Sequence, residues 1–405
     1  MAGAFCGPQL RAADGRVTRE VFLKSPGEGT AVMAAAWYTK KKGGDMLSVE
    51  TRYSRSDTVD IAYYRTSKDH GRTWSAPTPQ PTSERRPDGM LRRHPRTGVV
   101  EPTIGEFIEF FVQGVLPTDD PLEGMRRWNI FYRVDGRTRQ AIHKGSEFSP
   151  EHTFPGVYNG RSMVMLGDVA SQPLVRKDGT ILLPAVTTPL TADGKPYNPT
   201  GGYTYTDAIV LQARWRNGGL EWTAAEPVKG DPARCTRGMD EPTLAELPDG
   251  RILMVLRGSN DRNPELPAYK WVCFSSDGGM HWTEPKPWTY STGEHFFAPS
   301  ACSQLIQHST GRLFWIGHIS ATNARGNRPR YPVYLGEVDR KSGLLLRDSL
   351  VRIDDRQPDE DEILMLYSLC AREDRLDHSI ALQMSRLFAF PNAWRGDALL
   401  YSIRV

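Results

Sequence analysis

The sequence lacks the long apolar runs and cysteine patterns that mark membrane proteins and metal-stabilised or disulfide-rich domains. No run of 18 apolar residues occurs in the 405-residue chain, so we expect no membrane-spanning helix. The five cysteines are odd in number and contain no CxxC pair, which argues against a disulfide framework and against zinc. No two histidines have the spacing of metal ligands, and we expect neither a metal nor any other cofactor.

An excess of charge of either sign is also missing. The 51 Lys and Arg residues nearly balance the 48 Asp and Glu residues, which leaves a net charge of +3. Such a balance gives no reason to expect nucleic acid as a partner. Residues 1–16 contain no apolar segment of the kind found in signal peptides, so we expect a soluble protein that is cytoplasmic, or secreted with its signal removed.

Apolar residues with a helical period are scarce, whereas short apolar runs separated by turn residues recur along the whole chain. The 37 glycines and 30 prolines punctuate strand-length segments such as 31–38, 46–53 and 61–65. Aromatic residues make up 10% of the chain, which also suits strands. The pattern therefore predicts an all-β protein with many short strands.

One hairpin, residues 240–257, carries the most informative pair of charged residues. An apolar run lies on each side of Pro248-Asp249-Gly250, which is typical of a tight turn. The second run, 252–256, is continuous, which predicts burial on both of its faces. Glu241 begins the first strand and Arg257 ends the second. An antiparallel hairpin therefore brings this carboxylate and this guanidinium to the same rim.

A turn of the form S-x-D-x-G-x-x-W occurs at 67–74 and again at 275–282, with a degraded copy at 216–222. In such a turn the aspartate accepts hydrogen bonds from backbone N–H groups, and the glycine supplies a left-handed residue. The tryptophan packs back under the loop. We interpret these segments as structural turns that do no chemistry.

A second repeat is interleaved with these turns. Four segments share a strand-turn form with an early proline: residues 100–104, 171–184, 240–244 and 299–315. Their prolines are 71, 69 and 57 residues apart. This period is somewhat above that of known four-stranded repeats and predicts a six-bladed β-propeller formed by residues 1–405 as a single domain. The alternative is a pair of β-sandwiches with similarity by chance.

Together these features resemble the sialidase (neuraminidase) superfamily. Its members combine Asp-box turns, or BNR repeats, with a six-bladed propeller. They also carry a hairpin of the form E-x-x-x-x-E-L-x-D-G-x-[IL]-x-x-x-x-R, which here runs from Glu241 to Arg257. The resemblance covers most of the chain. It implies an exo-acting retaining glycoside hydrolase that removes a terminal acidic sugar, sialic acid or a relative, from a glycan.

The resemblance also implies which residues carry the reaction. Family members use a tyrosine nucleophile that is paired with a glutamate, and an aspartate as acid/base. By position in the motifs, Glu241 is the glutamate, Tyr367 the tyrosine and Asp57 the acid/base, with Asp60 as its rival. A neutral tyrosine hydroxyl suits a sugar whose anomeric carbon bears a carboxylate, because a carboxylate nucleophile would be repelled.

Three arginines hold the substrate carboxylate in this family. Arg257 matches the second, and Arg330 is the choice for the third, with Arg328 as its rival. The first belongs to an R-I-P segment in the opening strand, where this chain has Phe22-Leu23-Lys24-Ser25-Pro26. Lys24 is then the expected cation, although lysine cannot make the planar two-pronged contact of arginine. The departure predicts a divergent member with a changed substrate or none.

Two further functions stay open at this point. One is a carbohydrate-binding propeller that keeps the basic pocket but lacks turnover. The other is a propeller lyase or hydrolase that acts on uronic-acid polysaccharides, in which His70 or His295 works against the sugar carboxylate.

Overall fold

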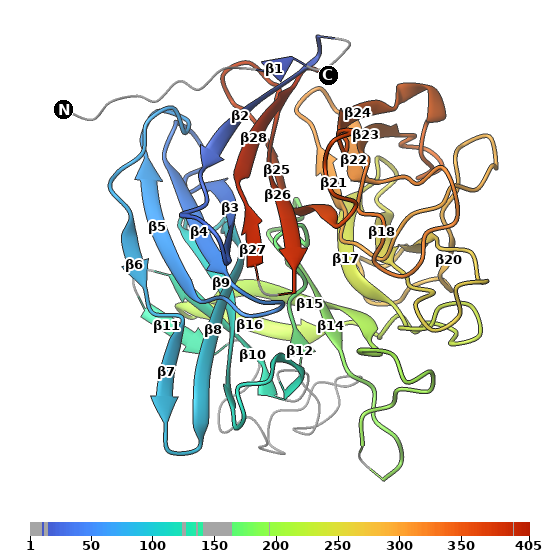
Figure 1. Cartoon of the computed structure of the whole chain (residues 1–405), viewed down its shortest axis with the longest axis horizontal. Coiled ribbons are helices and arrows are strands. Elements are labelled where there is room, and N and C mark those ends of the chain that lie inside the picture. Colours follow the sequence, from blue (N-terminus) through green and yellow to red (C-terminus); the bar gives the residue numbers. More distant parts are fainter. Residues whose placement is uncertain are drawn as a thin grey trace.

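The strands of the computed structural model are grouped into sheets that stand side by side in a ring, which is the arrangement of a β-propeller (Figure 1). The structure describes residues 10–11, 15–123, 127–134, 137–140, 164–193, 195–391 and 393–405. Its short helical elements include η1 (Pro121–Glu123) and η2 (Arg347–Ser349). Within these ranges no helix is long and apolar enough to cross a membrane. The prediction of an all-β propeller is confirmed.

The described strands form one ten-stranded, two five-stranded and two four-stranded sheets. In the order of hydrogen bonding, the ten-stranded sheet contains β1 (Leu10–Arg11), β2 (Val17–Leu23), β28 (Ala398–Ile403), β26 (Ile380–Phe390), β27 (Ala393–Gly396), β3 (Thr30–Tyr38), β4 (Met46–Tyr53), β5 (Ile61–Ser67) and β6 (Thr78–Gln80), and β25 (Leu364–Glu373) also pairs with β26. The first five-stranded sheet contains β11 (Arg137–Gln140), β10 (Asn129–Val134), β9 (Phe107–Leu116), β8 (Gly89–Val100) and β7 (Ser83–Arg86). The second contains β12 (Val164–Met165), β14 (Ile181–Thr187), β15 (Asp207–Arg216) and β16 (Gly219–Ala224), and β13 (Leu174–Val175) also pairs with β14. The first four-stranded sheet contains β17 (Asp240–Glu246), β18 (Ile252–Arg257), β19 (Lys270–Ser275) and β20 (Lys286–Pro287). The second contains β21 (Gln304–Gln307), β22 (Leu313–His318), β23 (Val333–Val338) and β24 (Val351–Asp354).

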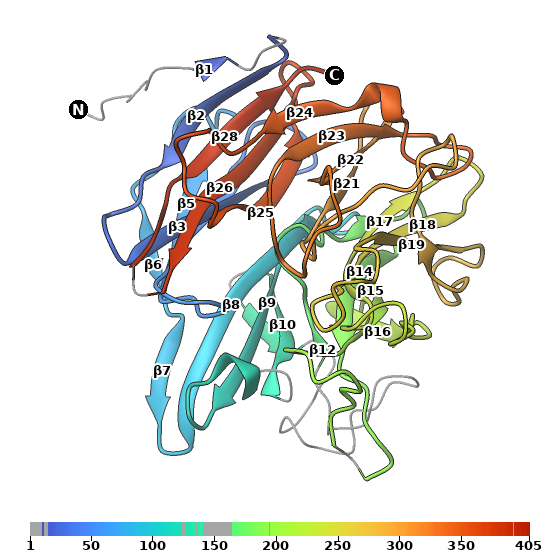
Figure 2. The same cartoon turned by 45° about the vertical axis from the view of Figure 1, so that its right-hand side comes forward.

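The number of blades expected from the repeats, six, is not confirmed by this grouping. The short strand β27 pairs with β3 in parallel, through Arg395 with Thr30 and Gly396 with Ala31. This pairing joins strands from the two ends of the chain into one sheet. Early and late strands of the chain therefore belong to one sheet, in which β27 stands between β26 and β3. Figure 2 shows β3 and β26 in the same part of the molecule.

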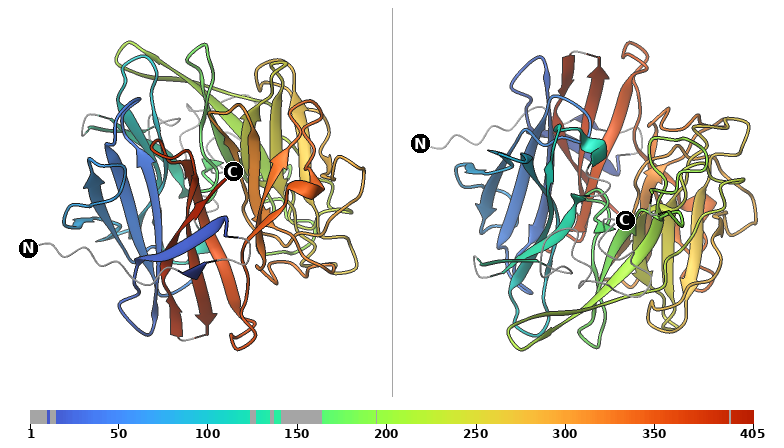
Figure 3. Two further views of the ribbon diagram at one scale, coloured as in Figure 1. Left: turned by 90° about the horizontal axis from the view of Figure 1, so that it is seen from above. Right: turned by 90° about the horizontal axis from the view of Figure 1, so that it is seen from below.

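Burial in this protein lies between the sheets. Every residue of β14 and of β18 is buried, because neighbouring sheets cover both faces of these strands. The predicted burial of residues 252–256 on both faces is thereby confirmed. Apolar clusters fill the spaces between successive sheets, for example Phe110 and Ile130 against Leu183. The core is thus a series of apolar layers between the sheets. Figure 3 shows the arrangement of these sheets from above and below.

The two S-x-D-x-G-x-x-W turns have the same hydrogen bonds. Asp69 accepts from the amide of Thr73 at 2.9 Å, and Asp277 accepts from the amide of His281 at 3.0 Å. Hydrogen bonds from Thr73 lower the pKa of Asp69 to about 2. These contacts support the structural interpretation, since each aspartate is engaged by its own turn.

A strand near the N-terminus, β2, closes the ring. Strand β2 pairs antiparallel with β28, from Val17 opposite Ile403 to Leu23 opposite Ala398. Both ends of the described chain therefore lie in one sheet, where blue β2 lies beside red β28 in Figure 1. The edge that the C-terminal strands would otherwise expose is paired.

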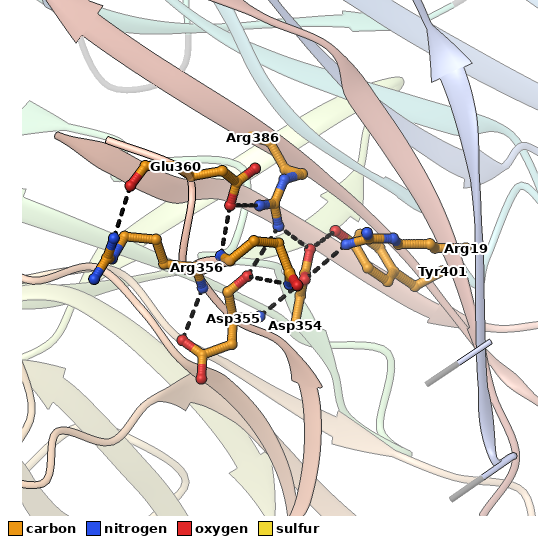
Figure 4. A network of polar contacts seen from close by, with 8 residues as sticks. Arg19, Asp354, Asp355, Arg356, Glu360, Arg386 and Tyr401 are labelled. Carbon is orange, nitrogen blue, oxygen red and sulfur yellow. Dashed lines mark hydrogen bonds and ion pairs between the residues drawn. The ribbon is translucent and has the colours of Figure 1, made fainter. Parts of the chain in front are cut away.

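A buried charge network supports this closure (Figure 4). Asp354, at the end of β24, accepts from Arg19 of β2 at 2.8 Å and from Arg386 of β26 at 2.6 Å. The Tyr401 hydroxyl of β28 also donates to Asp354, at 2.5 Å, and Arg386 forms a second ion pair with Glu360. The Asp354 side chain is only 4% exposed. One carboxylate thus joins the ten-stranded sheet to its neighbour.

We expect Asp354→Asn to lower the free energy of unfolding by about 3 kcal/mol, because it leaves two partly buried guanidinium groups without the buried anion that they share. Chemical denaturation measures this change. Asp355→Asn is the matched control: this neighbouring side chain is 32% exposed and pairs with Arg352 at 3.3 Å, so its removal should change stability by less than about 1 kcal/mol. Equal effects of the two substitutions would contradict the structural role of the network.

Candidate active site

Three strands near the centre of the ring, where the sheets contact one another, are interrupted by β-bulges. The shifts of register lie between Pro95 and Thr97 of β8, between Asp240 and Thr243 of β17, and between Tyr367 and Cys370 of β25. Bulges re-aim side chains and are frequent beside active sites. Here they contain Arg96, Glu241 and Ser368, so three separate sheets present polar groups to one region.

The backbone is strained at two of these bulges. Glu241 has φ +41° and Ser368 has φ +61°, values in the left-handed region that cost a residue with a side chain of the order of 1–3 kcal/mol. Strain of this kind persists only where the surrounding structure imposes it. Its presence on two strands of the same region points to a functional site.

A pocket of about 330 Å³, including open solvent, lies beside the bulges. Strand β3 contributes small and apolar residues to it, including Met33 and Ala35, and β4 contributes Tyr53. The polar part of the lining includes Arg96 and Asp168. Burial raises the pKa of Tyr53 to about 12, against the nearby charge of Arg96.

Asp168, which lines this pocket, interacts with the carboxylate of Glu241, which is not among the lining residues. Burial raises the pKa of Asp168, and the negative charge of Glu241 raises it further. The Oδ2 atom of Asp168 is buried without a hydrogen-bond partner of normal geometry among the described residues. Gly167 permits the close approach, since a Cβ there would lie 3.2 Å from Cγ of Glu241 and 2.7 Å from Oγ of Ser171.

Glu241 is held by Arg257, as the hairpin predicted. Nη1 of Arg257 donates to Oε2 of Glu241 at 2.9 Å, and both side chains are 10% exposed. Although burial raises the pKa of Glu241, the charge and the hydrogen bond of Arg257 lower it overall. Arg257 also donates to Oγ of Ser300 at 2.8 Å and to Oδ1 of Asn327 at 3.3 Å. The two carboxylates thus have pKa values shifted in opposite directions.

Arg330 and Tyr367 lie against each other. The guanidinium carbon of Arg330 is 4.9 Å from the centroid of the Tyr367 ring, and Nη2 donates to the carbonyl oxygen of Ser300 at 3.0 Å. Arg330 is 6% exposed, and its Nε has no hydrogen-bond partner among the described residues. Burial raises the pKa of Tyr367 well above its usual value, and the charges of Asp168 and Glu241 add to this effect.

The predicted hydrogen bond between Glu241 and Tyr367 is not among those of the described residues. Tyr367 instead interacts with Asp168 and lowers the pKa of that carboxyl group, although no contact between the two has the geometry of a full hydrogen bond. Asp168 was not identified from the sequence. It precedes the second copy of the proline repeat by five residues, where no motif marks it.

The other predicted site residues lie farther out. Asp57 is exposed at φ +54° and accepts from the Tyr203 hydroxyl at 3.2 Å, and its charge reaches Tyr53 in the pocket. Lys24 is exposed beyond the end of β2 and is not part of the pocket lining. Arg328 is exposed, so of the two rival arginines Arg330 is the buried one that contacts Tyr367.

Sequence reasoning also missed two cations of this region. Arg96 lines the pocket, and its Nε is buried without a partner among the described residues. Lys270 is 1% exposed and donates to the carbonyl oxygen of Ala301. Burial lowers the pKa of Lys270 to about 8, opposed by the charge of Glu241. A sequence signal existed only for Lys270, which begins a buried strand directly opposite Arg257.

The residues considered for other chemistry lie apart from the pocket lining. His70, in the turn at 67–74, has its Nδ1 3.3 Å from the hydroxyl of Tyr38, and His295 stacks on Tyr269 with ring centroids 4.9 Å apart.

Four cysteines are free and buried, while Cys6 lies outside the described residues. In the described ranges, no group of three or more His, Cys, Asp or Glu side chains is arranged to hold a metal ion.

Solved structures with the same architecture come from several glycan-acting proteins. No family model matches the chain, and no curated protein matches it. The NanB sialidase of Streptococcus pneumoniae (K499G mutant) is 13% identical with a TM-score of 0.58, covering 95% of this chain and 70% of that one. An α-L-arabinanase of Penicillium chrysogenum is 14% identical with a TM-score of 0.55, covering 97% and 98%. The chain has the fold of these propeller glycosidases.

A third similar structure is a protein of unknown function from Dyadobacter fermentans. It is 15% identical with a TM-score of 0.60, and the match covers 95% of this chain and 98% of that one. At these identities the likeness concerns the fold. The chemistry must be argued from the side chains of this chain.

We expect Glu241→Gln to lower the pKa of Asp168, because the neighbouring negative charge is removed and the ionised form of Asp168 becomes less unfavourable. Carbon-detected NMR titration of protein labelled at aspartate carboxyl carbons measures this pKa, and the signal lost in Asp168→Asn assigns it. Glu246→Gln, at the far end of the same strand, is the control and should leave the value unchanged. A pKa of Asp168 that stays constant or rises in Glu241→Gln would contradict the coupling.

Proposed function

We propose that this protein is an exo-acting retaining glycoside hydrolase that removes a terminal acidic sugar, sialic acid or a relative, from glycans. The observation that carries the proposal is a pair of guanidinium groups, of which Arg330 lies against the partly buried ring of Tyr367 and Arg96 lines the pocket. Among the described residues, Arg96 and Arg330 form no ion pair, and each has a buried Nε without a partner. A substrate carboxylate supplies the missing anion, and guanidinium is the group best suited to bind it.

Each reacting group has a role in this proposal. The Tyr367 oxygen attacks the anomeric carbon while its proton passes to Asp168, and the bond to the leaving oxygen breaks as Asp57 protonates that oxygen. In the second step Asp57 takes a proton from water, the water oxygen attacks the anomeric carbon, and Tyr367 leaves and recovers its proton from Asp168. Two displacements at one carbon retain its configuration.

Asp168 takes the position that the sequence predicts for Glu241, because Asp168 is the carboxylate that interacts with the Tyr367 hydroxyl. A raised pKa makes Asp168 the stronger base of the two. Glu241 supports it by holding Arg257 and by adding a negative charge nearby. Arg330 and Arg257 then act as two of the three substrate-binding cations.

For the third cation we propose Arg96 in place of Lys24. Strand β3 presents Met33, Ala34 and Ala35 to the pocket, while Lys24 lies outside the lining. Arg96 approaches from the next sheet and restores a guanidinium at that side of the pocket.

We also propose that the ten-stranded sheet represents two blades, which gives six in all. Strands β25, β26, β28 and β2 form one antiparallel set, and β3, β4, β5 and β6 form another. Among the described residues, strand pairing links the two sets only through two residue pairs between β27 and β3, and this pairing is parallel. On this view the S-x-D-x-G-x-x-W turns are Asp-boxes of the first and fourth blades.

A second candidate function is the hydrolysis of a neutral furanoside by two carboxylates. It is favoured by the coupled pair Asp168 and Glu241, since most glycosidases use two carboxyl groups with separated pKa values. Similar structures include the α-L-arabinanase of Penicillium chrysogenum and an α-L-arabinofuranosidase of Fusarium graminearum, the latter 13% identical with a TM-score of 0.53 over 93% of this chain and 97% of that one. In this alternative Tyr367 has no covalent role.

We expect hydrolysis of a fluorogenic α-sialoside and a loss of kcat by at least about 100-fold in Tyr367→Phe, because the attacking oxygen is removed. Tyr334→Phe, on β23, is the matched control and should keep wild-type activity. The assay includes a fluorogenic α-L-arabinofuranoside as the second substrate. Turnover of the arabinofuranoside alone, undiminished in Tyr367→Phe and abolished in Asp168→Asn, would establish the two-carboxylate alternative instead.

We expect Arg330→Gln to weaken the binding of free N-acetylneuraminic acid by about 2 kcal/mol, or roughly 30-fold, because a charge-assisted hydrogen bond to its carboxylate is lost. Calorimetric titration measures the affinity, and thermal unfolding shows that the variant is folded. Arg328→Gln changes an exposed arginine two residues away and should bind as the wild type does. Equal affinity of the two variants would exclude Arg330 from the carboxylate site.

A further inference from the structure

We propose that Tyr203 and Arg237 form a binding site for the leaving group, and that this leaving group is a sugar ring with a negative charge. The proposal rests on the proposed function, because it identifies the second half of the same substrate. Tyr197 and Tyr203 are 36% and 48% exposed, and in the described part of the chain they are the large exposed aromatic side chains other than histidine. Both belong to residues 188–206, between β14 and β15.

The segment that carries Tyr203 is fixed to the candidate active site. The amide of Thr206 donates to the carbonyl of Arg237 at 3.2 Å, and the amide of Met239 donates to the carbonyl of Thr206 at 2.9 Å. Gly238 has φ +69°, and a Cβ on it would lie 2.1 Å from the Thr206 oxygen, so only glycine permits this approach. Strand β17, which bears Glu241, follows directly. Backbone hydrogen bonds therefore join the segment that carries Tyr203 to the start of the strand that bears Glu241.

Tyr203 reaches across the ring to the proposed acid. Its hydroxyl donates to Oδ2 of Asp57 at 3.2 Å, although the two residues are 146 positions apart. The leaving group begins at the oxygen that Asp57 protonates. The Tyr203 side chain, which is hydrogen-bonded to Asp57, therefore borders the leaving group. A tyrosine ring with one exposed face and one polar end suits stacking against the C–H face of a sugar ring.

Arg237 favours a leaving sugar that carries a negative charge. It is 8% exposed, its Nη2 donates to Oγ1 of Thr204 at 2.5 Å, and its Nε is buried without a partner. Its guanidinium carbon lies 5.7 Å from the centroid of the Tyr203 ring. Within the described ranges Arg237 forms no ion pair, although the charges of Asp240 and Asp261 are nearby. A buried guanidinium with a free donor beside an aromatic platform is suited to an anion on the stacked sugar.

The charges around Tyr203 orient that sugar. Burial raises the pKa of Tyr203, the negative charges of Asp57 and Asp120 raise it further, and the positive charge of Arg237 lowers it. The acidic group of the leaving sugar must therefore point toward Arg237, and its hydroxyl groups toward the carboxylates. The substrate class that fits both halves of the site is a chain of linked acidic sugars.

Three substrates with the same terminal sugar test this inference: α2,8-linked disialic acid, 3′-sialyllactose and methyl α-sialoside. They offer an acidic leaving sugar, a neutral leaving sugar and no leaving sugar. We expect kcat/KM to fall in that order, and the acidic disaccharide to be favoured over the neutral one by roughly tenfold, as one charge-assisted hydrogen bond allows. Equal values for the two disaccharides would overturn the proposal.

Variants assign the preference to the two residues. Arg237→Gln should abolish the ratio between disialic acid and sialyllactose, whereas Arg262→Gln, an exposed arginine nearby, should preserve it. Tyr203→Ala should abolish the preference for disaccharides over the methyl sialoside, and Tyr203→Phe, which keeps the ring, should retain most of it. A ratio that survives in Arg237→Gln would refute the site. Failure to hydrolyse all three substrates would overturn the proposed function and this inference with it.

Discussion

Every sheet of this protein needs a neighbour on each face, and the ring of sheets is the arrangement that satisfies this need. Strands such as β14 and β18 are buried at every position, so neither can end the stack. A stack of apolar sheets without ends must close on itself. Closure places the inner strands of different sheets next to one another, and the candidate site lies at that meeting.

The chemistry of the site follows from crowding charges into this enclosed region. Arg257 compensates Glu241 so fully that the pKa of this glutamate falls despite its burial. Among the described residues Asp168 forms no ion pair, and its pKa rises although the charge of Arg96 opposes the rise. Tyr367, between these anions and Arg330, keeps its proton until a base removes it. Two carboxylates of similar intrinsic acidity thus acquire different properties from their neighbours alone.

The sequence predicted the parts of this site that depend on local geometry. Glu241 and Arg257 were placed together because hairpin strands pair in a register that the turn determines, and the structure contains their ion pair. The burial of residues 252–256 followed from their uninterrupted apolar character. The strand-rich fold was predicted from the repeats, because their spacing can be read directly from the sequence.

The parts that depend on the ring were not predictable in this way. Asp168 and Arg96 reach the pocket from strands and loops of different sheets, and no motif brackets either residue. Bulges decide where Arg96, Glu241 and Ser368 point, and a bulge leaves no clear trace in composition. The sheet count differed from the expected one because a two-residue parallel contact at β27 carries no apolar pattern.

The pairing of β2 with β28 also has a consequence for biosynthesis. After β2 has left the ribosome, the strands of all the other sheets are made before its hydrogen-bonding partner β28. Throughout that interval the nascent chain holds unpaired strand edges and an uncovered apolar sheet face. Contacts of such long sequence separation form slowly, and exposed edges invite association with other chains. A protein of this design depends on protection of its early strands until β28 has been made.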